Sequence, residues 1–333
     1  MANQTTTKYR TFISRIENNH IEETLLYGLQ WIKWDEIIGF NSHVFIKPNF
    51  TWPKYKPGVT TTPKLIETLI KVLKVRTHNF TIGESNGGVN TWTAEKAFTG
   101  HGLYEICKAN DVNLVNLSSL KSEYVEIEVD SKPFGVELPS MLLHDIDVFI
   151  TLPVLKTHVF TKVSLGMKNQ WGCIPDAMRL LHHPNLDRGI VALNKALKTR
   201  ISIIDAIYGL DGCGPMYGEP VKMDLLIVSN NVAAGDFIGC KLMGIQPETI
   251  KHLRIAQKEN LAPENIQGID VNVDVNQFVS RQFKVTRTPL SWAALLASKS
   301  YPLTKLIYDS PLTPAKNFVM GLIRGNSQTQ SYS

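Results

Sequence analysis

Short apolar runs alternate along the chain with longer segments in which apolar residues recur at helical spacing. The runs 43–47, 80–83 and 112–117 are rich in β-branched and aromatic residues, which is typical of strands buried on both faces. After the first run, Thr62 is a suitable helix cap, Pro63 suits the first helical position, and apolar residues follow at i, i+4 and i+8. The alternation predicts an α/β fold with a mostly parallel sheet, helices on both faces and Rossmann-like units.

The run 147–152, closed by Pro153, predicts another buried parallel strand. We expect a hairpin at the edge of the sheet from 124–129 and 136–138, and a glycine-rich loop over 209–218. The same patterns predict the remaining elements: a strand and a helix within 1–35, a helix over 93–109 interrupted near Gly100 and Gly102, a helix over 187–197, strands over 201–204 and 224–228, and a helix over 232–243.

Three parts are predicted along the chain. Residues 1–200 form an N-terminal α/β subdomain that carries the main candidate site, and residues 201–285 form a second α/β segment that completes its cleft. From Thr286 onward the sequence changes to short apolar segments broken by prolines, so residues 286–333 are predicted to be a helical tail. The tail is expected to pack on the body. The alternatives are a homodimer face or partner docking through 286–325, or contact with a membrane surface.

The amino-acid composition is that of an ordinary globular protein, and its charge indicates which kinds of molecule the protein could bind. The 333 residues are 43% hydrophobic and 20% charged, which is enough for a sizeable core. The net charge of +5 comes from 35 basic and 30 acidic residues scattered without a block of one sign, so nucleic-acid binding is not indicated. A mild positive excess suits a small anionic molecule if the charge gathers at one cleft.

The four cysteines are widely spaced and include no C-x-x-C pair. An iron–sulfur cluster is therefore not expected, and a structural zinc site is disfavoured, because both need closely spaced thiolates. Reduced thiols indicate a cytoplasmic protein. The N-terminus lacks the apolar centre of a signal peptide, and no apolar run is long enough for a transmembrane helix.

Polar residues follow two of the predicted strands at their carboxyl ends, where ligands of open α/β sheets sit. They are Lys47 and Asn49 after the run 43–47, and Lys156, His158, Lys168 and Asn169 after the run 147–152. Lysines suit carboxylate or phosphate oxygens, and a histidine could move a proton near neutral pH. We predict substrate binding by Lys47, Asn49, Lys156 and Asn169, and catalysis by His158 and Lys168. For any one of these side chains, a solvated or structural role is the alternative.

Four further residues are candidate ligands of a divalent metal, namely His182, His183, Asp205 and Asp236. Asp236 stands in an apolar helix of small residues, where an unpaired acid is costly to bury. The alternatives are ordinary ones, because adjacent histidines occur in many loops and an aspartate in the first turns is favoured by the helix dipole. The cofactor therefore stays unassigned, with a divalent metal as the candidate. No G-x-S-x-G turn is present to support a nucleophilic triad.

A set of motifs extends over roughly residues 40–260. The motifs are K-P-N at 47–49, T-T-T-P at 60–63, L-P-V-L-K-T-H at 152–158, K-N-Q-W-G at 168–172, I-I-D at 203–205, G-C-G-P at 212–215 and the helix around Asp236. Together they resemble an uncharacterised family, domain of unknown function 362. Many members of that family carry an appended ferredoxin-like module, which this sequence lacks, so the resemblance implies no electron-transfer role here.

The chain is more distantly similar to the nickel-pincer lactate racemases. His158 and Lys168 stand ten residues apart, and His182 or His183 follows. The similarity implies an acid/base role for His158, anchoring of a cofactor or substrate by Lys168, and metal ligation by the later histidine. The second catalytic histidine of the racemases has no counterpart in the turn after Gly83, so two-base racemisation is not expected.

Three functions remain open from the sequence. The first is a cytoplasmic enzyme of unassigned reaction that acts on a small carboxylate or phosphate, held by lysines, with His158 as the acid/base. The second is a non-catalytic ligand-binding or scaffold protein. The third is a metal- or nickel-pincer-dependent enzyme.

Overall fold

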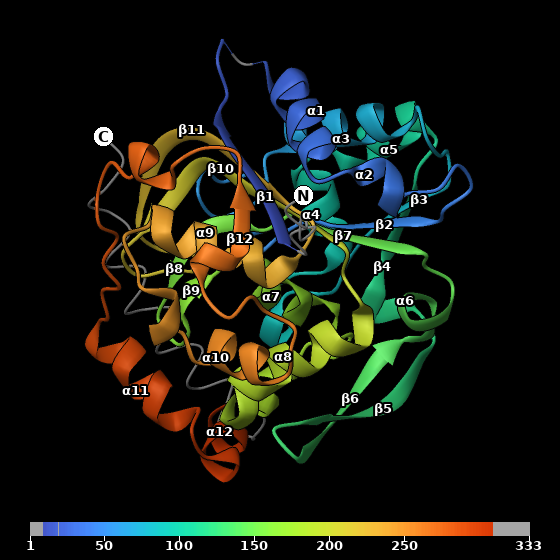
Figure 1. The fold of residues 1–333 in the computed structure, drawn as a ribbon. Helices are drawn as coiled ribbons and strands as arrows, with labels where there is room; N and C mark the ends of the chain where they lie inside the picture. Colours follow the sequence, from blue (N-terminus) through green and yellow to red (C-terminus); the bar gives the residue numbers. More distant parts are fainter. Residues whose placement is uncertain (1–8, 19, 309–333) are drawn as a thin grey trace, which may run out of the picture.

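The computed structural model describes residues 9–18 and 20–308, and a twisted sheet of ten strands lies at its centre (Figure 1). The strands are β1 (Tyr9–Arg15), β2 (Val44–Lys47), β3 (Phe80–Glu84), β4 (Asn113–Asn116), β7 (Val148–Thr151), β8 (Val154–His158), β9 (Lys162–Ser164), β10 (Ile201–Asp211), β11 (Glu219–Ser229) and β12 (Ile269–Val271). Their order is β12-β1-β11-β10-β7-β2-β3-β4, with β8 paired to β10 and β9 paired to β8.

Helices connect and cover these strands. They are α1 (Ile21–Trp31), α2 (Trp34–Ile37), α3 (Pro63–Leu73), α4 (Ala94–Gly100), α5 (Leu103–Asn110), α6 (Ser140–His144), α7 (Gly166–Asn169), α8 (Leu186–Leu197), α9 (Val232–Leu242), α10 (Lys251–Lys258), α11 (Pro289–Ala297) and α12 (Tyr301–Tyr308). Two short 3₁₀ segments, η3 (Gln170–Cys173) and η4 (Arg179–Asn185), continue from α7 toward α8.

The sheet separates two hydrophobic cores, as the apolar runs predict. In β2, Val44 and Ile46 face the core formed with α1, α3 and α5, whereas Phe45 faces the core formed with α8, α9 and α10. The ring of Phe45 lies 4.9 Å from that of Phe149 on the neighbouring strand β7. A strand whose successive side chains enter two cores must be apolar throughout, which explains the continuous run in the sequence. The mostly parallel α/β fold with helices on both faces is confirmed (Figure 1).

A topological switch point lies between β2 and β7. From β2 the chain moves outward through β3 and β4, and it then returns to form β7 and β10 on the other side of β2, all in parallel register. Lys47 and Thr151 end the two central strands and stand opposite each other. In open α/β sheets this is the position at which the connections diverge and ligands bind.

The glycine-rich segment 209–218 is not wholly a loop, and this expectation was wrong in part. β10 continues to Asp211, and β11 starts at Glu219 and pairs with it in antiparallel fashion. A Cβ on Gly209 would meet the ring of Phe283 at 3.0 Å. The glycine is therefore explained by close packing against an aromatic ring, and it does not mark a turn.

The hairpin predicted at the edge of the sheet forms, but as a separate sheet. β5 (Ser122–Val129) and β6 (Lys132–Pro139) pair only with each other. Phe134 of this hairpin belongs to the same core as α8, and a Cβ on Gly189 of that helix would meet its ring at 2.6 Å. Packing on α8 replaces pairing with the main sheet.

The predicted interruption of the helix over 93–109 is confirmed, because α4 ends at Gly100 and α5 begins after Gly102 in a left-handed conformation. The tail contains α11 and α12, and α12 packs against η4. Residues 309–333, which include the last part (309–325) of the predicted docking segment, lie outside the described residues. The division near residue 200 stays a prediction, and strands from both sides of it share the main sheet. Within the described part, no helix is both long and apolar enough to cross a bilayer.

Candidate functional site

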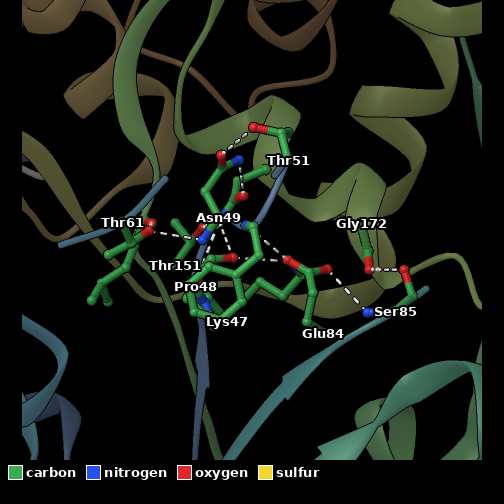
Figure 2. A network of polar contacts seen from close by, with 12 residues as sticks. Lys47, Pro48, Asn49, Thr51, Thr61, Glu84, Ser85, Thr151 and Gly172 are labelled. Carbon is green, nitrogen blue, oxygen red and sulfur yellow. Dashed lines mark hydrogen bonds and ion pairs between the residues drawn. The ribbon is translucent and has the colours of Figure 1, made fainter. Parts of the chain in front are cut away.

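Lys47 ends β2 with its ammonium group turned into the protein. Its Nζ donates to the carbonyl oxygen of Pro48 at 2.9 Å and to Oε2 of Glu84, at the end of β3, at 2.6 Å (Figure 2). The carboxylate of Glu84 also accepts hydrogen bonds from the backbone N–H groups of Phe50 and Ser85. Both charged side chains are buried, so each depends on the other for compensation of its charge.

The side chain of Asn169 fills the switch point. Its Nδ2 donates to the carbonyl oxygen of Lys47 at 3.0 Å and to Oγ1 of Thr151 at 2.8 Å, which joins the ends of β2 and β7. Its Oδ1 accepts a hydrogen bond from Nδ2 of Asn49 at 2.8 Å. Asn169 therefore satisfies backbone groups that would otherwise be orphaned where the two strands diverge.

Lys156 is fully buried on β8 and makes three hydrogen bonds. Its Nζ donates to Oδ1 of Asn49 at 2.6 Å, to Oγ1 of Thr51 at 2.9 Å and to the carbonyl oxygen of Val59 at 2.7 Å. Burial, reinforced by the nearby charge of Lys168, holds the pKa of Lys156 well below its usual value. All three donors of an ammonium group are thus used to fix the loop that follows β2.

The structure joins four of the predicted substrate-binding residues in one network, formed by Lys47, Asn49, Lys156 and Asn169. Their hydrogen-bonding groups are directed at one another and at neighbouring backbone. Glu84 and Thr151, which sequence analysis missed, complete this network. An acidic residue at the end of the strand next to that of Lys47 was the available signal for Glu84.

A second cluster surrounds His158, at the end of β8. The Nδ1 atom of this buried ring accepts a hydrogen bond from the backbone N–H of Phe160 at 3.1 Å, so the neutral ring carries its proton on Nε2. Burial is the main reason that the pKa of His158 is well below its usual value, and the charges of Lys168, His183 and His252 act in the same direction. The ring is therefore neutral at physiological pH.

Lys168, on α7, is partly exposed, and it differs from the other two lysines in having no acceptor. Within the described part of the chain, its Nζ has neither a hydrogen bond nor an ion pair. Burial lowers the pKa of Lys168 to about 8; the carboxylate of Asp187 opposes this shift and the guanidinium of Arg179 adds to it. A lysine amine that has no partner and titrates near neutral pH is typical of a residue that binds an anion or acts as a nucleophile.

The adjacent histidines of η4 have different surroundings. His183 packs against the rings of Phe160 and Trp171, at 5.2 and 6.0 Å between centroids. Burial lowers the pKa of His183 to about 3, with Lys168 contributing. His182 instead lies beside Phe134, 5.7 Å between centroids. His183 is therefore the member of the pair that belongs to the cluster of His158 and Lys168.

Sequence analysis missed a fourth member, His252 of α10. The ring is fully buried, its Nδ1 lies 3.5 Å from Oδ1 of Asp187, and its Nε2 has no hydrogen-bond partner among the residues described. It is near enough to His158 that a positive charge on its ring would lower the pKa of His158. The sequence offered only a lone histidine beside Leu253 on the apolar face of a helix, a pattern that is more often structural.

The carboxylates of the predicted metal ligands Asp205 and Asp236 accept hydrogen bonds from backbone N–H groups. Asp205 accepts hydrogen bonds from the N–H groups of Thr62 and Ile207, and Asp236 accepts from those of Gly166 and Met167. Burial raises the pKa of Asp236 to about 7. Among residues 9–18 and 20–308, no three His, Cys, Asp or Glu side chains are grouped to hold a metal ion. The predicted set, which also includes His182 and His183, is not assembled.

A cavity of about 380 Å³ lies elsewhere, after the end of α9. Its lining includes Lys241, Gly244, Glu248, Ile266 and Asn276. None of the residues predicted for the site contributes to it. The cavity and the two clusters at the ends of β2, β7 and β8 are therefore separate places in the fold.

Comparisons with known proteins were made at three levels. A family model described as "Domain of unknown function (DUF362)" matches residues 44–241. A thylakoid-associated protein from Synechocystis sp. is 27% identical over 229 residues, which are 66% of this chain and 68% of that protein. The family match includes both clusters except for His252, and it excludes the tail.

Two solved structures resemble the fold distantly. The lactate racemase apoprotein from Thermoanaerobacterium thermosaccharolyticum superimposes with a TM-score of 0.48 and 16% identity, and a protein from Thermotoga maritima with a TM-score of 0.39 and 14% identity. Each match covers 71% of this chain and 57% of the other. The chain thus spans little more than half the length of either protein.

Proposed function

The chain belongs to the family described as Domain of unknown function (DUF362), and on that premise we propose that it is an enzyme acting on a small anionic substrate, a carboxylate or a phosphate. The reaction would take place at the cluster of His158, Lys168, His183 and His252. Family membership does not carry a reaction, so the proposal rests on these side chains.

The observation that carries the proposal is the amine of Lys168, which is only partly exposed and has no acceptor among the described residues. Below its pKa of about 8 it is a cation that lacks a counter-charge in direct contact, and an anionic substrate would supply one. Its pKa is lowered mainly by burial, so a substrate carboxylate or phosphate would be bound in surroundings that strengthen the attraction.

His158 and His252 would have complementary roles, one as a hydrogen-bond donor and one as a base. The lone pair on Nδ1 of His158 is occupied by the N–H of Phe160, so its Nε2–H would donate a hydrogen bond to negative charge developing on the substrate and would keep its proton. In His252, Asp187 lies beside Nδ1 and favours a proton there, which leaves the Nε2 lone pair to accept one. The sequence predicted an acid/base role for His158 alone, and the proposal assigns hydrogen-bond donation to His158 and acceptance of the proton to His252.

Lys47, Asn49, Lys156 and Asn169 would support the site by holding the strand ends and the following loop. The predicted contact of these residues with substrate would require their present hydrogen bonds to open. The predicted metal ligands do not form a suitable set of donors, so no step is derived through a metal ion.

The proposal is tested by calorimetric titration with malonate and with malonamide, its neutral counterpart. Wild-type protein should bind the dianion and not the diamide, and Lys168→Met should bind neither. Lys96→Met, which changes an exposed lysine on α4, should retain binding. Retained malonate affinity in Lys168→Met would remove the central observation.

Native mass spectrometry of freshly purified protein should reveal the class of a co-purifying ligand. If that ligand is turned over, His158→Gln and His252→Gln should each reduce kcat by at least about 10²-fold, the range of general acid–base catalysis. Unchanged turnover in both variants would remove the two histidines from the reaction, whereas a co-purifying ligand that is bound and never turned over would favour the alternative of a non-catalytic binding protein.

A further inference from the structure

The helices α11 and α12 expose most of their large apolar side chains. Trp292 and Leu296 of α11 are 50% and 60% exposed, and Tyr301 and Leu303 of α12 are 52% and 41% exposed. Trp292 and Leu296 are four residues apart and therefore lie on the same face of their helix. In Figure 1 the two helices lie along the outside of the body, at the lower left.

The charge of this region has one sign. From residue 275 to residue 308 the sequence contains five basic residues, Arg281, Lys284, Arg287, Lys299 and Lys305, and no Asp or Glu. Lys284, Lys299 and Lys305 are exposed. Arg281 is ion-paired with Asp211 and Glu219, so the exposed cations that accompany the aromatic and aliphatic side chains are those of the three lysines.

The two helices are attached to the body and to each other. Nε of Arg287 donates to the carbonyl oxygen of Val159 at 2.8 Å, and its guanidinium lies 5.0 Å from the ring of Trp292. Oγ1 of Thr304 donates to the carbonyl oxygen of Ala297 at 3.0 Å, which joins α12 to the end of α11. The apolar side chains are therefore presented by a fixed pair of helices.

We infer that α11 and α12 bind the surface of a membrane containing anionic lipids. Tryptophan and tyrosine favour the membrane–water interface, and adjacent lysines are attracted by anionic headgroups. The helices have 9 and 8 residues, too few to cross a bilayer, so they would lie on its surface. A second copy of the chain is a poorer occupant, because two faces of the same positive charge would meet.

Co-sedimentation of the full chain with vesicles tests the inference. The protein should sediment with phosphatidylcholine–phosphatidylglycerol vesicles and not with phosphatidylcholine alone, and binding should fall as salt rises. Trp292→Ser and Leu296→Ser should each weaken binding by roughly tenfold, because each removes an exposed apolar side chain that the membrane would bury. Lys299→Gln and Lys305→Gln should each weaken it by about fivefold.

Matched controls lie elsewhere on the surface. Tyr124 on β5 and Val75 just after α3 are more exposed than Trp292 and Leu296, and Lys96 is an exposed lysine on α4. Tyr124→Ser, Val75→Ser and Lys96→Gln should leave binding unchanged. Equal sedimentation of Trp292→Ser and wild type would overturn the inference. So would a dimer in solution that Trp292→Ser dissociates, because a second copy would then cover this face. The result is independent of whether Lys168 binds malonate.

Discussion

Lys47 and Glu84 form a buried ion pair across the ends of two neighbouring parallel strands. The Nζ atom of Lys47 lies 2.6 Å from Oε2 of Glu84, and the two side chains are only 1% and 7% exposed. Neither residue has solvent to compensate its charge. The pair therefore fixes the geometry of the strand ends on which the Asn169 network is built.

Removal of one partner should be far more costly than loss of a surface pair. Glu84→Gln leaves the Lys47 ammonium buried without a counter-charge, and we expect a loss of about 3–5 kcal/mol in the free energy of unfolding. Urea denaturation measures it. Glu67→Gln, which breaks partly exposed pairs with Lys64 and Lys71, is the control and should cost less than about 1 kcal/mol. Similar losses in the two variants would contradict the prediction.

Gly172 leaves no room for a side chain beside this ion pair. A Cβ at Gly172 would lie 2.8 Å from Oε1 of Glu84 and 2.9 Å from Nζ of Lys47. Gly172→Ala should therefore displace the pair and destabilise the protein by about 1–3 kcal/mol in the same denaturation experiment. Gly88→Ala, where a Cβ would meet nothing within 4 Å, should have little effect. An unchanged midpoint for Gly172→Ala would show that the pair can move freely.

Lys168 should reduce the stability of the folded protein at neutral pH. Its pKa falls from 10.5 to about 8 on folding, so the unfolded chain binds more protons between these values and stability should rise with pH across that window. Lys168→Met should therefore stabilise the protein at pH 7, and the gain should shrink near pH 10. Urea midpoints at both pH values measure this. Lys47→Met should instead destabilise, because it leaves Glu84 unpaired. A destabilised Lys168→Met would mean that the amine has an acceptor.

Asp236 should produce the opposite slope at lower pH. Burial raises the pKa of its carboxyl from 3.8 to about 7, so the folded state binds more protons between these values and stability should fall as pH rises. Urea midpoints of wild type and Asp236→Asn, measured from pH 4 to pH 7, should differ in slope, with the variant flatter. Asp35→Asn, at an exposed position, should keep the wild-type slope. Parallel curves for wild type and Asp236→Asn would refute the prediction.

The sequence predicted those parts of the fold that depend on local patterns. The apolar run of β2 and the Thr62–Pro63 start of α3 are determined by propensity and by burial on two faces, and both are confirmed. The extension of β10 through Gly209 was not predictable, because it depends on pairing with β11 and the ring packed on Gly209 belongs to Phe283, a residue distant in sequence. The sequence does not distinguish a glycine that is needed for a turn from one that is needed for close packing.

The sequence predicted which residues belong to the candidate site, but it did not predict how their side chains contact one another. Lys156 and Lys168 look alike in the sequence, yet one makes three hydrogen bonds inside the protein and the other makes none among the described residues. The difference arises from the loop containing Asn49 and Val59, which folds over β8. His252 gave no signal, because its neighbour Asp187 is 65 positions away, as the numbering shows.

The contact of α12 with η4 links two regions that have otherwise been described separately. η4 carries His183, and α12 is one of the helices with exposed aromatic and aliphatic side chains. A surface that displaces α12 would therefore act on η4, the segment that carries His183. A substrate screen with lipid vesicles would then place η4 in other surroundings than a screen in plain buffer, so a compound that is inert in buffer should be tested again with vesicles.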